Sequence, residues 1–481
     1  MTTATTKRHN ALYEDLTAIV GSKYVSDDDF VLWAYAHDAS SVYHVYGKPQ
    51  GIVVRPGTTD DVVEIVKLAN QTLTPIVPRG GGLGIGGPLP GAPGKAIVVD
   101  MTRMDKIIDI DDENKIVIAE AGITECELVT RVNEKGWDIL NTAFQPYYTT
   151  TLGGHISGAS CGAGMHLGRS WNWKGVIGMK VVLPNGTVLE TNRWNINQDS
   201  GQPFRWVPAP DFTGFFSGTY GAFGIITEGT LRMFRLKKIK YVDVMFFNTF
   251  DSLWHALYEL SEIDPYPCEY VFCPNPKTSG IMGLRENQFG LIYSVEGRDE
   301  EEAGLKHKTI REIGQKLGGE HGTDIEAKSC ADLQKRVFKN MGTVASIGMW
   351  SLLELVIGRK DFPAVFKEHA AWSQAKFKEK GIEGKLTDFH LVFPIDETFI
   401  SSVMLFYDDN DLELRKKVAD ITHEFFDYIN KRGYVSFESA TGRSLATGTS
   451  KFYRPEFRDF LYTLKRAVDP NNIMNPGAFG F

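Results

Sequence analysis

Cysteine is scarce in this chain of 481 residues, and the five cysteines show no pattern typical of metal or disulfide sites. No two of them have the spacing of a CxxC pair, and none joins histidines in a zinc-type cluster. The sequence therefore predicts reduced thiols and no metal site. The five residues are Cys126, Cys161, Cys268, Cys273 and Cys330.

Positive charge and long apolar runs are lacking as well. Lysine and arginine number 52 against 60 acidic residues, and the net charge of −8 excludes a basic surface for nucleic acid or anionic lipid. The longest apolar stretch, residues 342–358, carries Glu354 and is shorter than the ~20 residues of a membrane span, so we expect it to line a core or a cavity. No apolar signal segment opens the chain. These absences predict a cytoplasmic protein with no membrane span and no nucleic-acid partner.

Glycine, by contrast, is abundant, with 48 residues in the chain, and it gathers in clusters. The first cluster, residues 78–88, follows an expected strand and holds six glycines in eight positions. It lacks the Lys-Ser/Thr ending of a P-loop, and Pro88 stands where a dinucleotide fingerprint would open a helix. A backbone so rich in glycine can bring its N–H groups close to an anion, and a pyrophosphate is the natural guest.

Two further clusters extend this pattern. Residues 149–164 alternate small and hydroxyl side chains, so this segment can lie flat against a large planar ligand and offer it donors. His155 and His166 flank the segment, and each either touches the ligand or caps a turn. A third glycine-rich stretch covers residues 213–228.

The apolar spacing predicts two domains of different texture. A helix is expected over residues 10–36, a strand–helix–strand unit over 51–79, and a hairpin over 178–190 with an Asn-Gly turn. The first ~235 residues therefore read as one α+β domain. From about residue 238, apolar strands alternate with charged helices, which predicts an antiparallel sheet with helices on one side.

Eight pieces of the sequence occur in an order that resembles the FAD-binding family typified by vanillyl-alcohol oxidase, the flavoprotein of p-cresol methylhydroxylase and FAD-linked D-lactate/glycolate dehydrogenases. Each piece is weak by itself, but eight in order are specific, and they span residues 50–237 and the C-terminal tail. The pieces are Val53-Val-Arg-Pro, Pro75-Ile-Val-Pro-Arg-Gly-Gly-Gly, Val99-Asp-Met-Thr-Arg-Met, Glu120-Ala-Gly-Ile-Thr, Thr151-Leu-Gly-Gly, Gly178-Met-Lys-Val-Val-Leu-Pro-Asn-Gly, Gly221-Ala-Phe-Gly-Ile-Ile-Thr-Glu and Asp469-Pro-Asn-Asn-Ile-Met-Asn-Pro-Gly.

The resemblance implies an α+β fold with a two-part FAD-binding domain of the PCMH type. A substrate or cap domain, built from an antiparallel sheet and helices, would lie over the flavin ring, and the C-terminal tail would return to the FAD domain. The expected divisions are an N-terminal helical segment at 1–47, the FAD-binding domain at 48–237, the cap domain at 238–430 and the C-terminal segment at 431–481.

The resemblance also implies FAD as cofactor. The first glycine loop and residues 150–164 would bind the pyrophosphate and the isoalloxazine, and Ile226 would lie by the adenine or ribose. The expected FAD-binding residues are Pro78, Arg79, Gly80, Gly81, Gly82, Leu83, Gly84, Gly86, Gly87, Glu120, Thr150, Thr151, Gly153, Gly154, Ser157, Gly158, Ser160, Gly164, His166, Gly224 and Ile226.

Family chemistry of this kind is a two-electron oxidation, in which a hydride leaves carbon for the flavin N5 and a base takes the hydroxyl or phenol proton. Two second-domain residues are candidates for the catalytic groups. His390 lies on an apolar alternating strand and is either the base or a satisfied core histidine. Arg443 lies in a glycine-flanked polar loop and either clamps a carboxylate or phenolate or is a surface arginine.

Departures from the family patterns narrow the substrate. The metal-binding His-x-Gly-Asp-x-x-x-His pattern of the lactate/glycolate branch is absent, and the nearest segment reads Asp388-Phe-His-Leu-Val-Phe. Residues 84–91 resemble the Gly-Tyr-Gly-Gly-x-x-Pro of the phenol-oxidising branch, although that branch's Arg-Phe-Asn-Glu run is missing. We therefore favour an alcohol or alkylphenol over a metal-dependent 2-hydroxy acid.

Several alternatives stay open at this stage. They are a 2-hydroxy-acid dehydrogenase, a non-redox enzyme similar to alkylglycerone-phosphate synthase, and the flavin subunit of an electron-transfer complex. The electron acceptor would be oxygen, a cytochrome, an electron-transferring flavoprotein or an iron–sulfur subunit. A homodimer is the family expectation. The first glycine loop offers no histidine or cysteine for a covalent flavin link.

Overall fold

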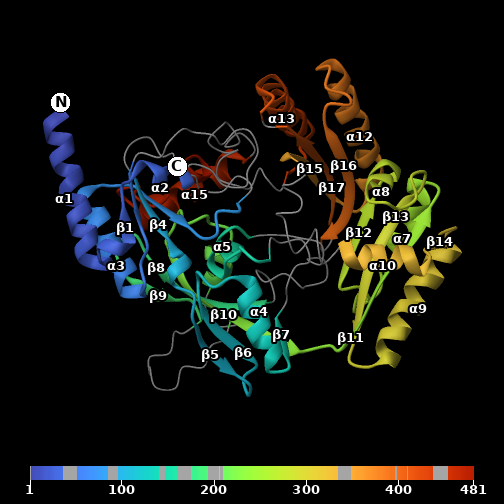
Figure 1. Cartoon of the computed structure of the whole chain (residues 1–481), viewed down its shortest axis with the longest axis horizontal. Coiled ribbons are helices and arrows are strands. Elements are labelled where there is room, and N and C mark those ends of the chain that lie inside the picture. Colours follow the sequence, from blue (N-terminus) through green and yellow to red (C-terminus); the bar gives the residue numbers. More distant parts are fainter. Residues whose placement is uncertain are drawn as a thin grey trace.

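Three β-sheets organise the part of the chain that the computed structural model describes (Figure 1). Two sheets lie in the N-terminal half, and the third forms the C-terminal half together with its helices. The structure describes residues 2–35, 51–84, 96–139, 147–159, 175–192, 205, 210–333, 348–395, 398–408, 410–436 and 453–481.

The first sheet has the strand order β1-β2-β4-β3, with β2, β4 and β3 parallel and β1 antiparallel to β2. Its strands are apolar on both faces because helices cover both: α1 and α3 pack on one face and α2 on the other. The strand–helix–strand unit expected over 51–79 is confirmed as β2, α3 and β3. The elements are β1 (Val25–Ser26), β2 (Gly51–Val54), β3 (Ile76–Arg79), β4 (Ala96–Asp100), α1 (Thr2–Val20), α2 (Asp29–Ala34) and α3 (Thr59–Thr72).

The sequence predicts one helix over residues 10–36, but the structure interrupts it between residues 21 and 28. Helix α1 ends at Val20, and Gly21 takes a φ of +91°, which is outside the helical region. A short 3₁₀ turn (Ser22–Tyr24) and β1 follow, and α2 begins only after Asp28, whose carboxylate accepts the backbone N–H of Phe30. A single glycine therefore turns one expected helix into two elements on opposite faces of the first sheet.

The second sheet is antiparallel, with the strand order β5-β6-β10-β8-β9 and β7 pairing with β10. The expected hairpin over 178–190 is confirmed as β8 and β9, and Gly186 at its turn has a φ of +84°. The elements are β5 (Ile107–Asp111), β6 (Ile116–Glu120), β7 (Trp137–Ile139), β8 (Val176–Val182), β9 (Val188–Glu190), β10 (Ile225–Arg235), α4 (Glu125–Glu134), α5 (Leu152–Ser157) and α6 (Phe212–Phe216).

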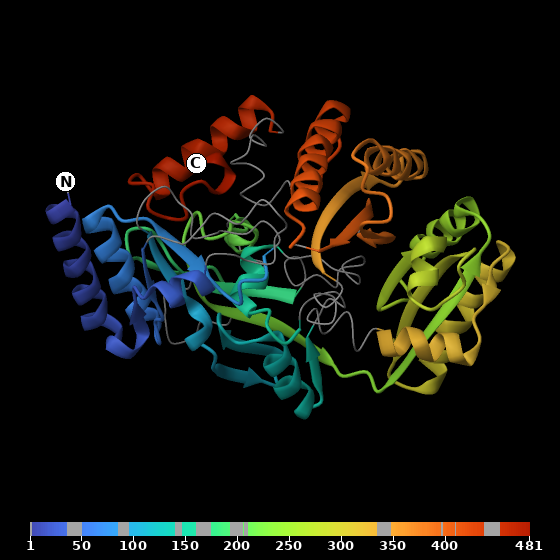
Figure 2. The same cartoon turned by 45° about the horizontal axis from the view of Figure 1, so that its top comes forward.

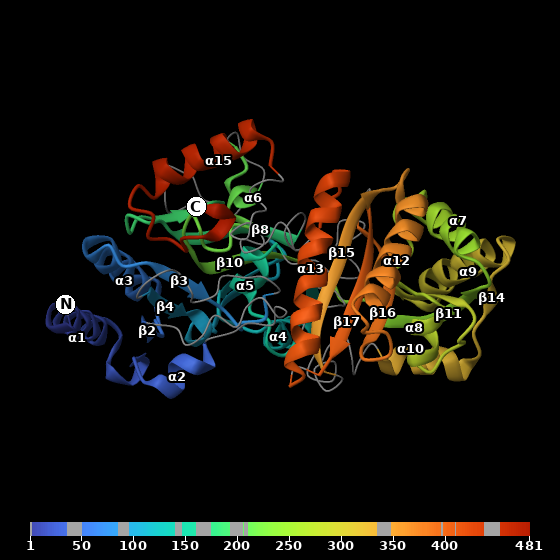
Figure 3. The same ribbon diagram turned by 90° about the horizontal axis from the view of Figure 1, so that it is seen from above.

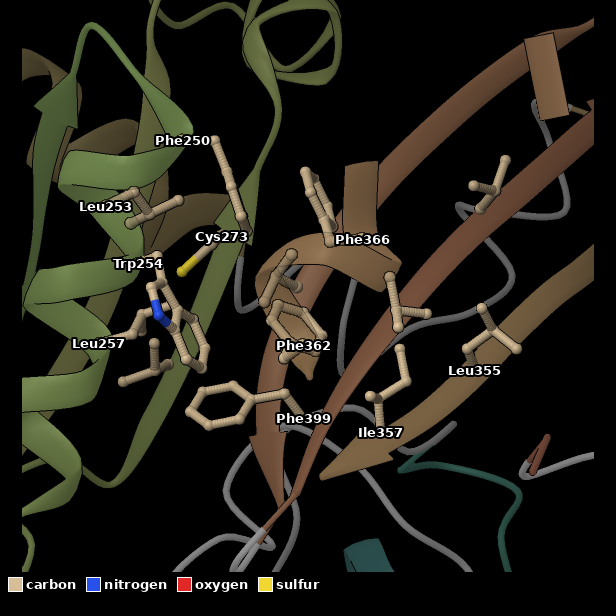
Figure 4. Packing of buried hydrophobic residues seen from close by; sticks show 14 of the residues in the cluster. Phe250, Leu253, Trp254, Leu257, Cys273, Leu355, Ile357, Phe362, Phe366 and Phe399 are labelled. Atoms are coloured by element: carbon tan, nitrogen blue, oxygen red, sulfur yellow. The ribbon is translucent and has the colours of Figure 1, made fainter. Parts of the chain in front are cut away.

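The third sheet, called the cap sheet below, is antiparallel throughout and has the order β14-β11-β13-β12-β16-β17-β15. Its main core lies between the sheet and a layer of helices that includes α7, α9, α12 and α13 (Figure 4). The strands are β11 (Ile239–Phe247), β12 (Tyr270–Pro274), β13 (Phe289–Gly297), β14 (Glu320–His321), β15 (Met349–Gly358), β16 (Thr387–Ile395) and β17 (Thr398–Tyr407). The helices are α7 (Phe250–Ser261), α8 (Pro276–Ile281), α9 (Glu300–Lys316), α10 (Asp324–Leu333), α12 (Phe362–Glu379) and α13 (Leu412–Arg432).

The sequence predicts helices on one side of the cap sheet, but the structure has helices on both sides. Val244 and Phe246 point to the face opposite Met245 and Phe247, where they pack with Cys330 of α10. The run from Val244 to Phe247 is apolar at every position, so both faces of β11 must be covered. Helix α10 covers the second face at this end of the sheet.

The C-terminal segment returns to the N-terminal half, which confirms the expected path of the tail. Helix α15 (Pro455–Val468) lies with the two N-terminal sheets and not with the cap sheet (Figure 3). The tail then joins the edge of the first sheet: Ile76 donates its N–H to the carbonyl of Ile473, and Asn475 donates to the carbonyl of Ile76. Met474 packs into the core of that sheet.

Candidate active site

The end of β3 and the start of α5 meet at a glycine-lined cradle. A Cβ atom at Gly80 would lie 2.2 Å from Thr151 Oγ1, and one at Gly81 would lie 1.9 Å from the carbonyl oxygen of Thr149. Both distances are far below any real Cβ contact, so these two positions require glycine. The structure thus brings the first and second glycine clusters of the sequence into direct backbone contact.

Helix α5 begins at this cradle for a local reason. The Thr151 side chain accepts a hydrogen bond from the N–H of Gly154 and so caps the helix. Gly153 donates its N–H to the carbonyl of Ala121 at 2.7 Å, an approach that a side chain at Gly153 would block. Residues 152–157 therefore form a short helix instead of the flat segment that the sequence suggests, because the threonine cap and these contacts favour a helical turn.

The third glycine cluster closes the arrangement. Tyr220 donates its N–H to the carbonyl of Ser157 and its hydroxyl to the carbonyl of Gly158, each at 3.0 Å. A Cβ at Gly221 would lie 2.7 Å from Pro78 Cγ, so this turn packs against the end of β3. Three clusters that are distant in sequence therefore form one backbone-lined surface.

A buried pair of ionisable side chains supports α5 from behind. His155 Nδ1 lies 2.5 Å from Glu125 Oε1, and both residues are fully buried. The backbone N–H of Glu125 also donates to the carbonyl of Thr150. These contacts tie the first turn of α4 to α5, so the described contacts of His155 stabilise the packing of these two helices, a role that the sequence did not suggest.

Known proteins resemble the chain along most of its length. Residues 50–192 match the family described as FAD binding domain, and residues 275–479 match the family described as FAD linked oxidases, C-terminal domain. The chain is 24% identical to glycolate oxidase subunit GlcD of Bacillus subtilis over 489 residues, covering 96% of this chain and 95% of that protein. It is 23% identical to the flavoprotein subunit of 4-cresol dehydrogenase (hydroxylating) of Pseudomonas putida over 514 residues, covering 98% and 95%.

The solved structures add the fold. The crystal structure of p-cresol methylhydroxylase with substrate bound aligns with a TM-score of 0.83 at 20% identity, covering 98% of this chain and 96% of that one. The chain belongs to the p-cresol methylhydroxylase and vanillyl-alcohol oxidase family. It is an FAD-dependent oxidoreductase.

The cradle of this FAD-dependent oxidoreductase has the chemistry that its cofactor needs. Gly80 and Gly81 bring the loop against Thr149 and Thr151, and a glycine-rich backbone can present its N–H groups to a pyrophosphate. Thr150 Oγ1 is buried and makes no hydrogen bond within the described part of the chain, so it can donate to a bound group. These residues fit FAD, although their individual contacts with it stay predictions.

The structure describes the other predicted FAD residues of the first glycine loop as far as Gly84. Arg79 has its guanidinium 5.1 Å from the ring centre of Tyr35, and a Cβ at Gly82 would strike this guanidinium. Leu83 is the side chain nearest to Gly81, and Gly84 follows it in an exposed stretch of the loop. Arg443, Gly86, Gly87, Ser160, Gly164 and His166 lie outside the described residues.

Three other predicted residues are engaged with the second sheet. Glu120 accepts the backbone N–H of Lys106 through its carboxylate. Gly224 lies so close to β8 that a Cβ there would be 2.8 Å from the carbonyl oxygen of Val182. Ile226 is buried in the core of the second sheet. These contacts explain the residue types structurally and leave their contact with FAD a prediction.

His390, the predicted base, lies inside the core of the cap domain. Its imidazole stacks on Phe366 at 4.5 Å, and its Nε2 lies 2.9 Å from Ser401 Oγ, which also bonds Nδ1 of His369. Burial lowers the pKa of His390 to about 3 and holds the pKa of His369 well below its usual value, so both rings are neutral. These contacts favour the core alternative for His390, and its role as a base stays a prediction.

Sequence reasoning did not single out two buried carboxylates of this oxidoreductase as site residues, Glu125 and Glu354. Glu354 stands alone as a charge in an apolar strand, and that isolation was the signal available in the sequence. Among the described residues, no group of three or more histidine, cysteine, aspartate or glutamate side chains could hold a metal ion. Within the same residues, no helix is both long and apolar enough to cross a membrane.

Proposed function

We propose that this enzyme oxidises an alcohol, an alkylphenol or phenolic alcohol, or a hydroxy acid at a site between its FAD-binding domain (48–237) and its cap domain (238–430). Residues 431–481 would serve as a segment that packs on the FAD domain, except at its start, where α13 ends and Val356 of β15 donates its N–H to the carbonyl of Val435. The observation that carries the proposal is the glycine cradle, where Gly80 and Gly81 touch the turn before α5. The cap sheet supports it, because the face not covered by α12 and α13 is turned toward the FAD-binding half (Figure 2).

FAD would supply the acceptor for the hydride that leaves the substrate carbon. The cradle residues would hold its phosphates through backbone N–H groups, with Thr150 and Thr151 adding hydroxyl contacts. Arg443 would bind a carboxylate or a phenolate of the substrate through its guanidinium. The electron acceptor would be oxygen, a cytochrome, an electron-transferring flavoprotein or an iron–sulfur subunit.

Within this class we favour an alcohol or alkylphenol. The metal-binding histidine pattern of the hydroxy-acid branch is absent from the sequence, and residues 84–91 resemble the phenol-oxidising branch. The relatives include both a glycolate oxidase subunit and a 4-cresol dehydrogenase, so the choice rests on these sequence features.

Anaerobic absorption spectroscopy of the purified protein tests the proposal. 4-Hydroxybenzyl alcohol, 4-cresol and D-lactate are added in separate cuvettes, and the flavin band near ~450 nm is followed. We expect bleaching by one of the two phenols. Bleaching by lactate alone would move the enzyme to the hydroxy-acid branch. A yellow protein that all three leave unbleached would contradict this substrate choice and favour the non-redox alternative.

Admission of air after bleaching then separates the acceptors. Rapid return of the yellow colour would identify an oxidase. A flavin that stays reduced in air would identify a dehydrogenase, or the flavin subunit of an electron-transfer complex, that needs a protein acceptor. A cytochrome added to the reduced protein provides the matched second measurement.

A further inference from the structure

One face of the cap sheet is defined by the alternation of residues along β15. Leu353, Leu355 and Ile357 point into the core beneath α12 and α13, as the close-up of that core shows for Leu355 and Ile357 (Figure 4). Leu352, Glu354 and Val356 therefore point to the opposite face. That opposite face, called the open face below, is the one turned toward the FAD-binding half (Figure 2).

Strand register shows what surrounds Glu354 on the open face. Glu354 pairs with Ser402 of β17, and Ser402 pairs with Leu391 of β16. Of the residues that share this face on the three strands, Glu354 alone carries a charge. The other described residues are Trp350, Leu352, Val356, Gly358, Thr387, Phe389, Leu391, Thr398, Ile400, Ser402, Met404 and Phe406.

The carboxyl group of Glu354 is buried, and the described residues satisfy its bonding only in part. The residue is 5% exposed, and its Oε1 makes no hydrogen bond within the described part of the chain. Ser402 provides the hydrogen bond to the side chain. An ionised carboxylate in such surroundings is costly unless it has partners, and a ligand hydroxyl on this face would provide one.

Burial also tunes the acidity of this group. It raises the pKa of Glu354 to about 7, against the smaller lowering effect of the Ser402 hydrogen bond. No described charged group contributes to that pKa. At neutral pH the carboxyl group is therefore divided between its two protonation states, as suits a group that accepts a proton in each turnover.

We propose that Glu354 binds the hydroxyl group of the substrate and accepts its proton, and that the apolar open face holds a neutral alkyl or aryl alcohol or phenol. This inference rests on the proposed function. For an alcohol, the O–H proton passes to the Glu354 carboxylate as the C–H hydrogen leaves with its electron pair for FAD. The products are a carbonyl compound, reduced FAD and a protonated Glu354, which releases its proton before the next turnover.

A binding experiment tests the role of Glu354 without requiring turnover. Phenol lacks an oxidisable carbon and ionises near ~10, so it stays neutral from pH 5.5 to 8.5. Its binding to the FAD-loaded protein is measured from the change in flavin absorption across that range. We expect the wild type to bind phenol about tenfold more tightly above pH 7 than below it, because the ionised carboxylate accepts the stronger hydrogen bond.

The Glu354→Gln variant should bind phenol with no such pH dependence, whereas Glu354→Asp should keep it. Glu424→Gln, on the outer helix α13 where it bonds Lys376 and Lys380, is the matched control and should behave as the wild type. Equal pH profiles in the wild type and Glu354→Gln would overturn the assignment. Failure of phenol to perturb the flavin of the wild type at any pH would overturn the substrate class.

Two further measurements keep this inference separate from the proposed function. With whichever substrate bleaches the wild type, Glu354→Gln should reduce its FAD about 100-fold more slowly while retaining a full complement of FAD. If no substrate bleaches the wild type, the proposed function fails, but the phenol profiles still decide whether Glu354 binds a hydroxyl group.

Thermal unfolding is the second measurement. The thermal midpoint of the wild type should fall from pH 5 to pH 8 relative to that of Glu354→Gln, because the buried carboxyl group becomes ionised over this range. Parallel curves for the two proteins would contradict the burial of this carboxyl group.

Discussion

At the scale of single residues, burial decides what the ionisable side chains of the cap domain can do. His390 and His369 share the hydroxyl of Ser401 between α12, β16 and β17, and both are neutral in the folded protein. Glu354 lies on β15, on the opposite face of the same sheet, with an oxygen that the described residues leave unbonded. His390 is thus a core residue with a hydrogen-bond partner, whereas Glu354, on the opposite face of the sheet, has an oxygen available to a ligand.

The two histidines predict a loss of stability in acid. Their folded-state pKa values lie below the ordinary value of about 6.5, so the unfolded chain takes up protons that the folded chain cannot. Their contribution is fully present above pH 6.5 and is lost as the pH falls toward 3. We expect the difference in unfolding free energy between pH 7 and pH 5 to shrink by about 2 kcal/mol in His390→Gln.

Urea unfolding of the wild type and His390→Gln at the two pH values provides the measurement, and His423→Gln on α13 serves as control. An unchanged pH dependence in His390→Gln would contradict the buried, neutral state of this ring. Flavin reduction by the same variant should proceed near the wild-type rate. A large slowing with FAD still bound would support the role of His390 as a base.

At the scale of elements, the binding surface depends on how closely a loop and a helix turn approach. Gly80 and Gly81 after β3 touch the backbone and side chain of the turn that opens α5. Neither element forms the cradle alone, because β3 belongs to the first sheet and α5 packs on the second. A bulky side chain at this contact must therefore move the two sheets apart.

Gly81→Val should abolish the retention of FAD. A Cβ at this position would lie 1.9 Å from the carbonyl oxygen of Thr149, and backbone cannot yield as a flexible side chain would. The measurement is the ratio of flavin absorption to protein absorption after gel filtration. Gly304→Val is the matched control, because a Cβ at Gly304 of α9 meets nothing within 4 Å. A Gly81→Val protein that stays fully yellow would contradict the assignment of the cradle.

At the scale of the whole molecule, the last residues of the chain bind the N-terminal half together. Lys465 is buried, and its Nζ donates to the carbonyls of Ala222 and Met474 and to the carboxylate of Asp469, each at 2.7 Å. Asp469 in turn accepts the backbone N–H of Met474 at 2.8 Å. The lysine therefore links the glycine turn near residue 221 with the tail that pairs with β3.

Lys465→Met should destabilise the folded protein by about 3 to 5 kcal/mol, because it leaves the buried Asp469 charge without its partner. Arg466→Met is the control: the neighbouring side chain is exposed, and its loss should change the unfolding free energy by about 0.5 kcal/mol or less. Denaturant unfolding compares the two variants. Equal unfolding midpoints for both would show that the buried pair does not hold the tail.

Much of the fold was accessible to sequence reasoning because local chemistry specifies it. Short apolar runs bounded by turn residues predicted the strands of the first sheet, the Asn-Gly pair predicted the hairpin of β8 and β9, and ordered motifs predicted the FAD-binding family. Local signals were insufficient at Gly21, where one φ angle broke an expected helix. Local signals were also insufficient for the cap sheet, where the sequence predicted helices on one side and the structure covers both faces of β11.

The sequence by itself determined the residue types of the cofactor cradle, since only glycine permits the backbone approaches seen at Gly80 and Gly81. It could not decide between the alternatives for His390 or assign a role to Glu354, because both residues lie on apolar strands and look alike in one dimension. Tertiary structure separated them: strand alternation turns His390 toward the helices and Glu354 toward the FAD-binding half. The physical reason is that burial, partners and the identity of the facing surface arise only when strands from distant parts of the chain pair.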